Sequence, residues 1–256
     1  MTTISLPGPL SSTPGTTSST PGTTLVTKPV TSFPSPAGAA LAAVSGRTSV
    51  PLLAPSDLPT GLSATAETRG GDYDVQLYHC RRTFGFNNPN IGAPPYCAGL
   101  GAVFGSFGAQ PFPSLASNRL TGKPINTLTD LLRAPTCPQG PGTASTVILA
   151  DGVQGMAESS GGELCDLRWT QRGWIIDITP SLATLSQEMP LARQLIIAVS
   201  TERLPAPRGV LSVEDAGDGE HTKAYWVQGE GLYWVGGYHL ASVALSLLGS
   251  VARVSG

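Results

Sequence analysis

Two stretches in the second half of the chain show the same succession of patterns, and this succession constrains the fold more than any other feature of the sequence. Residues 165–178 read CDLRWTQRGWIIDI and residues 223–237 read KAYWVQGEGLYWVGG. In both, a tryptophan precedes a polar turn that contains glycine, and an aromatic or aliphatic run follows. This order is typical of a β-hairpin. A further strand with a glycine-containing turn precedes each hairpin, in residues 146–155 and 208–221.

Apolar residues at helical spacing follow each hairpin. After the first hairpin the stripe consists of Leu191, Leu195, Ile196 and Val199. After the second hairpin it consists of Leu240, Val243, Ala244, Leu247, Leu248 and Val251, which predicts a closing helix over residues 240–254. We therefore predict an α+β fold: an antiparallel sheet built from two strand–hairpin–helix units and packed by helices. The two units form an internal duplication at about residues 147–200 and 209–254.

The first 46 residues differ from the rest of the chain in composition. The heptapeptide SSTPGTT occurs twice in succession, at residues 11–17 and 18–24, and seven prolines interrupt the segment. Such a sequence cannot bury enough apolar surface to offset the entropy of ordering it. We therefore predict a low-complexity extended arm or linker over residues 1–46 and a globular domain over residues 47–256. The arm is either a solvated spacer or a docking arm that becomes ordered against a partner, and scattered apolar residues such as Val30 and Phe33 favour docking.

Shorter signals describe the region between the arm and the first hairpin. The segment DYDVQLYHC, residues 72–80, alternates apolar and polar side chains as a half-buried strand does. A glycine-rich return strand is predicted at residues 98–109, and a short helix near residues 128–132.

Four cysteines indicate the redox compartment. Cys80, Cys97, Cys137 and Cys165 show no C-x-x-C pair and no zinc-ligand spacing. Three pairings are possible. Pairing of neighbours closes loops of about 17 and 28 residues, each stabilising by roughly 3–4 kcal/mol. Because two of the cysteines lie in irregular stretches rich in Gly, Pro or Asn, disulfides are favoured over four buried thiols, with Cys80 linked to Cys97.

Charge and hydropathy exclude several classes of protein. Only 12% of the residues are charged and the net charge is −2, without a basic block. A nucleic-acid partner is therefore not expected, because phosphate recognition needs a concentrated positive field. The apolar stretch at residues 37–44 is far shorter than the roughly 20 residues that span a bilayer. The first ten residues lack the basic start and apolar run of a signal peptide, so export would require a leader upstream of Met1.

Few residues point to catalysis. The nucleophile motif G-x-S-x-G is absent, and His79 and Cys80 are strand neighbours that point to opposite faces. Asp166 and Asp177 could be taken as the paired carboxylates of a glycosidase, but any chain of this size offers such pairs. We therefore expect no catalytic residues and no cofactor.

The acidic segment between residues 214 and 220 offers the best candidate for a metal site. Asp215, Asp218 and Glu220 could supply oxygen ligands to Ca²⁺, but they lack the spacing of an EF-hand loop. A solvated turn explains the same residues, so metal binding is the weaker interpretation.

Aromatic residues of the second hairpin offer the best candidate for a ligand site. Exposed aromatic rings stack on sugars. Trp234, Tyr233 and Tyr238 are the candidates, with Tyr225 as a further aromatic residue, and Trp234 lies near Gly236 and Gly237. Trp174 and Trp226 are expected in the core, since hairpin aromatics more often pack across strands.

A set of short motifs resembles a family of uncharacterised exported bacterial proteins that are frequent in cyanobacteria. The motifs are VPLLAPSDLP, YDVQLYHC, the loop between Cys80 and Cys97, TVILADG, CDLRW and the final YWVGGYHLASVALSLLGSVA. The resemblance covers roughly residues 48–256. It brings no known catalytic residues and implies an extracytoplasmic location.

Three functional hypotheses follow, in this order. The first is a non-enzymatic structural or interaction protein of a cell envelope, extracellular assembly or particle coat, with protein partners, self-assembly or a host assembly. The second is a glycan or small-ligand binding module that uses the aromatic hairpins. The third is an unrecognised hydrolase or metal-dependent enzyme. The expected location is the cell surface or the exterior, with a virion or particle component as the alternative.

Overall fold

The computed structural model describes residues 37–80, 84–85, 87–91, 97, 102–113, 120–132, 137, 139–215 and 220–254. Residues 1–36 of the predicted arm, which include the repeat at residues 11–24, and the candidate ligand Asp218 lie outside these residues.

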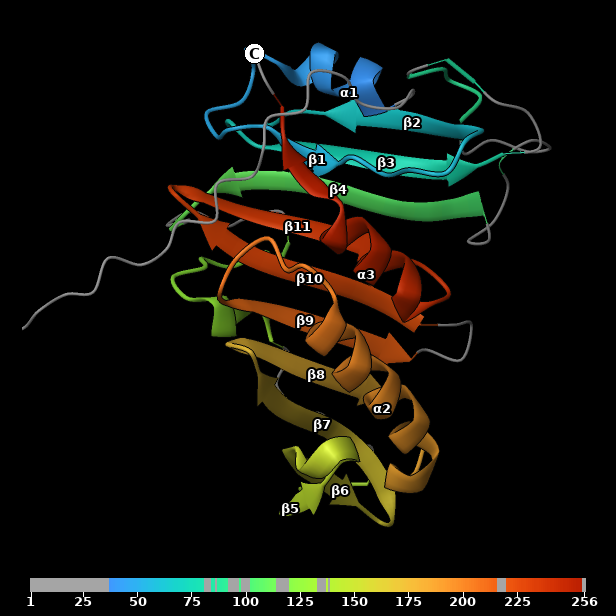
Figure 1. Ribbon diagram of the computed structural model, residues 1–256, viewed down its shortest axis with the longest axis vertical. Helices are drawn as coiled ribbons and strands as arrows, with labels where there is room; N and C mark the ends of the chain where they lie inside the picture. The colour runs from blue at the N-terminus through green and yellow to red at the C-terminus, as the bar shows by residue number, and fades with distance from the viewer. Residues whose placement is uncertain are drawn as a thin grey trace, which may run out of the picture.

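The described residues form one large, mostly antiparallel sheet (Figure 1). Its strand order is β2-β3-β4-β11-β10-β9-β8-β7-β6-β5. The strands are β2 (Leu62–Glu67), β3 (Tyr73–His79), β4 (Val103–Pro111), β5 (Thr143–Ile148), β6 (Gln154–Ser160), β7 (Glu163–Gln171), β8 (Trp174–Pro180), β9 (Gly209–Asp215), β10 (Glu220–Gln228) and β11 (Gly231–Gly237). A separate pair joins β1 (Leu53–Pro55) to β12 (Val251–Arg253).

The predicted α+β class and antiparallel sheet are confirmed, but the predicted composition of the sheet is wrong. The sheet is not built from two strand–hairpin–helix units, because β2, β3 and β4 also belong to it and β6 adds a strand to the first unit. Strand β4 pairs with β11 and thereby joins the N-terminal strands to the C-terminal hairpin. Local periodicity identifies a strand, but it carries no information about a partner more than 100 residues away.

One parallel pair interrupts the antiparallel order. Strands β8 and β9 run parallel, and helix α2 (Leu185–Thr201) connects them. A parallel pair needs such a crossover, because a two-residue turn cannot return the chain to the same end of the sheet. By contrast, β7 and β8 are joined by the two residues Arg172 and Gly173, both at positive φ, as in the tight turns that match the twist of a hairpin.

Helices cover one face of the sheet, which we call the helix face. Helix α2 and helix α3 (Ala241–Gly249) lie in front of the central strands (Figure 1), and α1 (Ala37–Val44) packs on β2 and β3. The main hydrophobic core lies between these helices and the strands. Its largest fully buried side chains include Trp174, Trp226, Tyr73, Tyr233 and Phe107.

The opposite face, which we call the groove face, carries a smaller hydrophobic cluster. It consists of Ile125, Leu131, Val210, Tyr225, Leu232 and Trp234. Ile125 and Leu131 belong to residues 120–132, which cross the strands and include the short 3-10 helix η2 (Leu128–Leu131). Alternate residues of the same central strands thus enter two different cores.

A tryptophan covers a glycine of the neighbouring strand on each face. On the helix face, a Cβ atom at Gly209 would lie 2.6 Å from the indole ring of Trp174. On the groove face, a Cβ atom at Gly108 would lie 2.4 Å from the ring of Trp234. Both glycines therefore make room for an indole that lies flat on the strand.

Two predictions about the ends of the domain need correction. The closing helix ends at Gly249 instead of residue 254, because Val251–Arg253 form β12 and pair with β1. Leu240, the first residue of the predicted stripe, is 58% exposed. At the other end, Ala37–Val44 lie within the predicted arm but form α1, with Ala37, Ala40, Leu41 and Val44 in the core. The folded region therefore begins at or before Ala37.

The four cysteines form two disulfides, as predicted. Cys80 is bonded to Cys97 and Cys137 to Cys165, so no cysteine is free. The second bond ties the chain after η2 to strand β7. None of the described helices is long and apolar enough to cross a membrane.

Candidate functional site: a polar groove on the sheet

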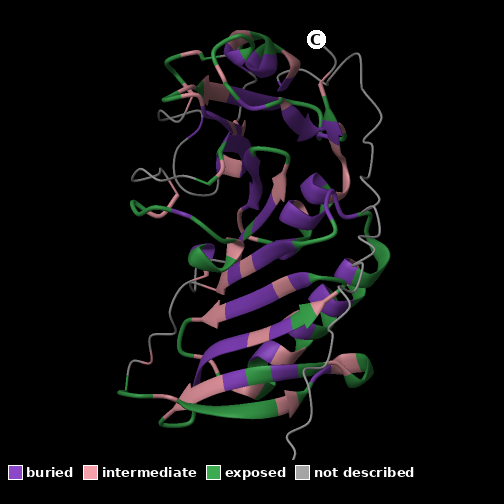
Figure 2. Cartoon of the chain, turned by 90° about the vertical axis from the view of Figure 1, so that its left-hand side faces the viewer, coloured by how far each residue is buried: buried purple, intermediate pink, exposed green. Residues whose placement is uncertain are grey.

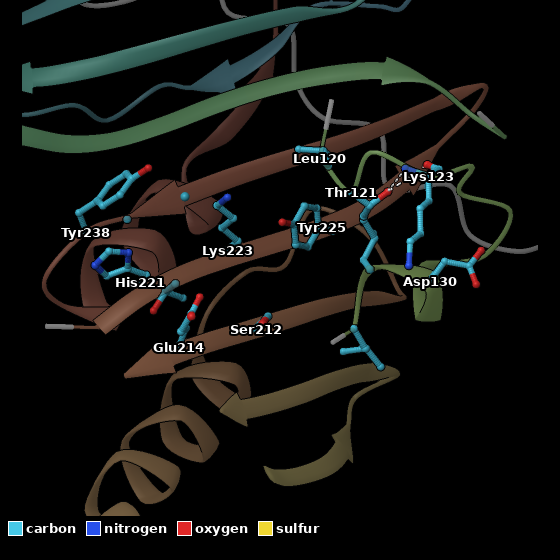
Figure 3. A pocket seen from close by; sticks show the side chains of 15 residues that line it. Leu120, Thr121, Lys123, Asp130, Ser212, Glu214, His221, Lys223, Tyr225 and Tyr238 are labelled. Atoms are coloured by element: carbon cyan, nitrogen blue, oxygen red, sulfur yellow. Dashed lines mark hydrogen bonds between the residues drawn. The ribbon is translucent and has the colours of Figure 1, made fainter. Parts of the chain in front are cut away.

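A groove of about 710 Å³ lies on the groove face, over strands β9, β10 and the end of β11. Residues 120–132 form its other wall (Figure 3). His221, Glu214 and Tyr238 gather at one end, and Thr121, Lys123 and Asp130 gather at the other. Ser212, Lys223 and Tyr225 lie between them.

Strand register places the polar residues of the floor. Ser212 on β9 lies opposite Lys223 on β10, and Lys223 lies opposite Gly236 on β11. Because opposite residues of antiparallel strands share a face, Ser212 and Lys223 both point into the groove. Gly236 keeps the floor low: a Cβ atom there would lie 3.0 Å from Ser106 Oγ and 3.5 Å from Lys223 Cγ.

Residues 120–132 form a wall held by its own hydrogen bonds. The carboxylate of Asp130 accepts the backbone N–H groups of Asn126 at 2.7 Å and Thr127 at 2.9 Å. These two bonds favour the ionised form and lower the pKa of Asp130. Thr121 Oγ1 donates to the carbonyl of Lys123 at 3.0 Å. With Ile125 fully buried beneath, the wall is anchored to the sheet.

One end of the groove combines an imidazole, a carboxylate and a phenol. His221 lies opposite Glu214 across β10 and β9. The rings of His221 and Tyr238 meet edge to face with centroids 5.3 Å apart. Burial raises the pKa of Tyr238, and the nearby Asp74 carboxylate adds to this shift. The hydroxyl of Tyr238 is therefore a neutral hydrogen-bonding group at ordinary pH.

The three predicted ligand-binding aromatic residues have different positions. Tyr238 lines the groove. Trp234 is 4% exposed and belongs to the cluster beside it. Tyr233 faces the helix side, where it stacks on Trp226 at 5.7 Å and donates to the carbonyl of Pro51. Trp174 and Trp226 lie in the core, as expected.

Sequence reasoning missed most of the groove. It named Tyr225 as a sugar-stacking aromatic residue, but it did not select Ser212, Lys223 or Lys123 as site residues. Strict alternation along β9 and β10 could have placed Ser212 and Lys223 on one face with Tyr225, because Ser212 and Tyr225 alternate with the core residues Leu211 and Ala224. The contribution of Lys123 from a distant segment has no such local signal.

The carboxylates Asp166 and Asp177 do come together, but beneath the surface. Arg168 Nη2 lies 2.8 Å from Asp177 Oδ1 and 3.3 Å from Asp166 Oδ1. Asp166 is 5% exposed and Asp177 is fully buried. Burial raises the pKa of Asp166 to about 7, with a hydrogen bond to Asp177 and its charge adding to the shift and Arg168 opposing it. This cluster lies outside the groove lining and holds strands β7 and β8 together.

Part of the predicted acidic metal site makes contacts that stabilise the fold. The carboxylate of Glu220 accepts the backbone N–H of Ala241 at the start of α3. Burial raises the pKa of Glu188 on α2, and the charges of Asp215 and Glu220 add to this shift. Within the described residues, no three His, Cys, Asp or Glu side chains are grouped so that they could hold a metal ion.

No protein-family model, curated protein or solved structure matches the chain.

Proposed function

We propose that the protein is an extracytoplasmic, non-enzymatic interaction protein that binds a neutral, hydroxyl-rich ligand, such as a glycan, in the groove. The observation that carries this proposal is the lining of the groove. Its volume of about 710 Å³ falls in the range of ligand pockets, and two tyrosines lie among hydroxyl, cationic and anionic groups.

The balance of charge in the groove favours a neutral ligand. Lys123 and Lys223 supply two cations, and Asp130 and Glu214 supply two anions. A phosphate or a polyanion would meet repulsion from the carboxylates, whereas the hydroxyls of a sugar can donate to carboxylates and accept from ammonium groups. Tyr238, which is partly exposed, adds aromatic surface of the kind that packs against the apolar face of a sugar ring.

The rigidity of the groove also supports a binding role. Its floor consists of hydrogen-bonded strands, and its wall is fixed by the turns around Thr121 and Asp130. A preformed site loses little conformational entropy when a ligand binds.

The two disulfides support an oxidising location. Such bonds persist in secreted and envelope proteins and are rare in reducing compartments. A glycan partner is compatible with that location.

The test is binding of neutral oligosaccharides to the full chain, with chitohexaose, cellohexaose, maltohexaose and xylohexaose as probes. We expect at least one to give saturation-transfer NMR signals and a measurable dissociation constant. Gly236→Val, which raises the floor, and Lys223→Ala, which removes a donor, should each weaken that binding about tenfold or more, in line with loss of a hydrogen bond to a charged group.

The matched control is Arg193→Ala, which removes an exposed cation from α2. It should leave binding unchanged. The proposal is wrong if none of the four oligosaccharides binds, or if binding persists undiminished in both groove variants.

A further inference from the structure

The two edge strands of the sheet are protected to different degrees. At one edge, the loop closed by Cys80–Cys97 supplies hydrogen bonds to β2. Asn87 donates its backbone N–H to the carbonyl of Ala64 at 3.1 Å. Its side chain accepts from the N–H of Ala66 at 2.9 Å and donates to the carbonyl of the same residue at 3.2 Å. Asn87 thus takes the place of a neighbouring strand.

At the other edge, β5 has outward backbone groups that can be identified from its pairing. The N–H of Leu149 donates to Val153 across the turn into β6. Since hydrogen-bonded and non-hydrogen-bonded pairs alternate in an antiparallel ladder, Val147 and Ser145 also bond towards β6. The N–H and C=O groups of Ala144, Thr146 and Ile148 therefore point away from the sheet. No described hydrogen bond involves the outer side of these three residues.

Strand β5 also lacks the features that block edge pairing. Its sequence, TASTVI, contains no charge, proline or glycine. Every residue except Val147 is exposed, and the strand forms the exposed lower margin of the sheet (Figure 2). Proteins commonly protect an edge with a lysine, a proline or a bulge, because an open edge is a template for another strand.

Two large apolar side chains accompany this edge. Ile148 is 62% exposed and Met156 on β6 is 49% exposed. Thr146 lies opposite Met156, and Ile148 shares its face, so both apolar side chains lie on the same side of the sheet.

We propose that β5 pairs with β5 of a second copy of this chain, antiparallel, across a two-fold axis at Thr146. Two identical strands are self-complementary in this arrangement, because each residue that contacts another is contacted by it in return. The axis at Thr146 brings all three outward residues into hydrogen-bonded pairs. Thr146 faces its own copy, and Ala144 of each copy faces Ile148 of the other. The two sheets join into one.

A second copy of the chain fits this edge without a steric clash or a repulsion between like charges. The small side chain of Ala144 leaves space for Ile148 from the other copy, so the exposed apolar residue gains a contact without a clash. The strand carries no charge, so the symmetric pairing sets no like charges against each other. This inference goes beyond the proposed ligand binding and does not depend on it.

A two-fold axis at Thr146 predicts a result in a charge-swap experiment that an interface elsewhere on the protein would not give. Sedimentation of the full chain should give a concentration-dependent dimer. Thr146→Lys and Thr146→Glu should each be monomeric, because the axis sets two like charges directly opposite each other. An equimolar mixture of the two variants should regain twice the monomer mass, because lysine then faces glutamate.

The control is Thr170→Lys, a lysine at an exposed position of β7, which should leave the dimer intact. Circular dichroism and melting temperature verify that the Thr146 variants are folded. A monomeric wild-type chain overturns the proposal. So does a dimer that survives both substitutions, or a mixture of folded variants that stays monomeric, as expected if another segment occupied the edge.

Discussion

The helix face and the groove face of the sheet bury apolar side chains in different ways. On the helix face, α1, α2 and α3 cover the strands, and the core extends from β2 to β6. On the groove face, the described cover is residues 120–132, and the cluster beneath it is confined to the central strands. Beside this cluster the strands present polar side chains. The contrast shows how one strand can bury one half of its residues in a core and present the other half to a polar groove.

The largest effect should come from a charge placed under a helix. Leu247 is 1% exposed in the main core, and Leu247→Asp would bury a carboxylate without a partner. We expect a loss of about 4 kcal/mol or more in the free energy of unfolding, measured with urea. Ser246→Asp, at an exposed position of the same helix, should change it by less than about 0.5 kcal/mol. Equal stability of the two variants would mean that α3 does not pack on the sheet.

Substituting one tryptophan in each core compares the contributions of the two cores to stability directly. Trp174 is fully buried and donates its indole N–H to the carbonyl of Ala206 at 3.0 Å. Trp174→Ala should cost about 3–5 kcal/mol, the usual range for such a truncation. Trp234→Ala, in the smaller cluster, should cost about 1–2 kcal/mol less, because the cavity there can collapse or fill with water. Chemical denaturation of both variants measures the two losses in the free energy of unfolding. A larger loss for Trp234→Ala than for Trp174→Ala would contradict this prediction.

Buried carboxyl groups on the groove face should make the free energy of unfolding fall as pH rises. Burial raises the pKa of Asp74 to about 6 and that of Asp166 to about 7, both above the value near 3.8 of an unfolded aspartate. The folded state therefore holds protons that the unfolded state has lost. This contribution is complete below about pH 4, declines as pH rises towards 7 and is absent above it. Glu188, on the helix side, shifts in the same direction.

Urea unfolding at pH 5 and pH 8 measures this decline, which we expect to reach at most about 4 kcal/mol at about 1.4 kcal/mol per pKa unit. Asp166→Asn replaces the carboxyl by an uncharged group of similar shape and should flatten the decline. If the variant kept the full pH dependence, Asp166 would not be its source.

The smallest effect on stability should come from the groove floor. Lys223 is exposed, so Lys223→Ala should change the free energy of unfolding by less than about 0.5 kcal/mol. The same substitution should weaken oligosaccharide binding. A large loss of stability would show that Lys223 belongs to the fold and would remove it from the site.

Local patterns predicted the elements that depend on local physics. The polar turn at Arg172 and Gly173, with Trp169 before it and an aliphatic run after it, identified the first hairpin, because a short turn pairs the two strands that it joins. The pairing of β4 with β11 could not be predicted, since many exposed edges compete for a strand. Leu240 and Val251 fitted a helical stripe, but Val251 pairs with Pro55 of β1, a partner that helical periodicity cannot reveal. The groove depends on register across β9, β10 and β11, which periodicity in a single strand does not fix.

The pairing of β1 with β12 has a consequence for the order in which the protein can form during synthesis. Leu53 lies opposite Arg253, and the hydroxyl and N–H of Ser56 both bond to the carbonyl of Ser250. A nascent chain that has not yet added Val251–Arg253 cannot close this contact, and β4 must also wait for β11. The meander of β5, β6, β7 and β8 needs only its own neighbours and can fold while later residues are still being added. A stalled or truncated chain should therefore expose the edge of β4 that β11 covers in the complete chain, which makes the N-terminal strands the part of the protein most in need of chaperone protection.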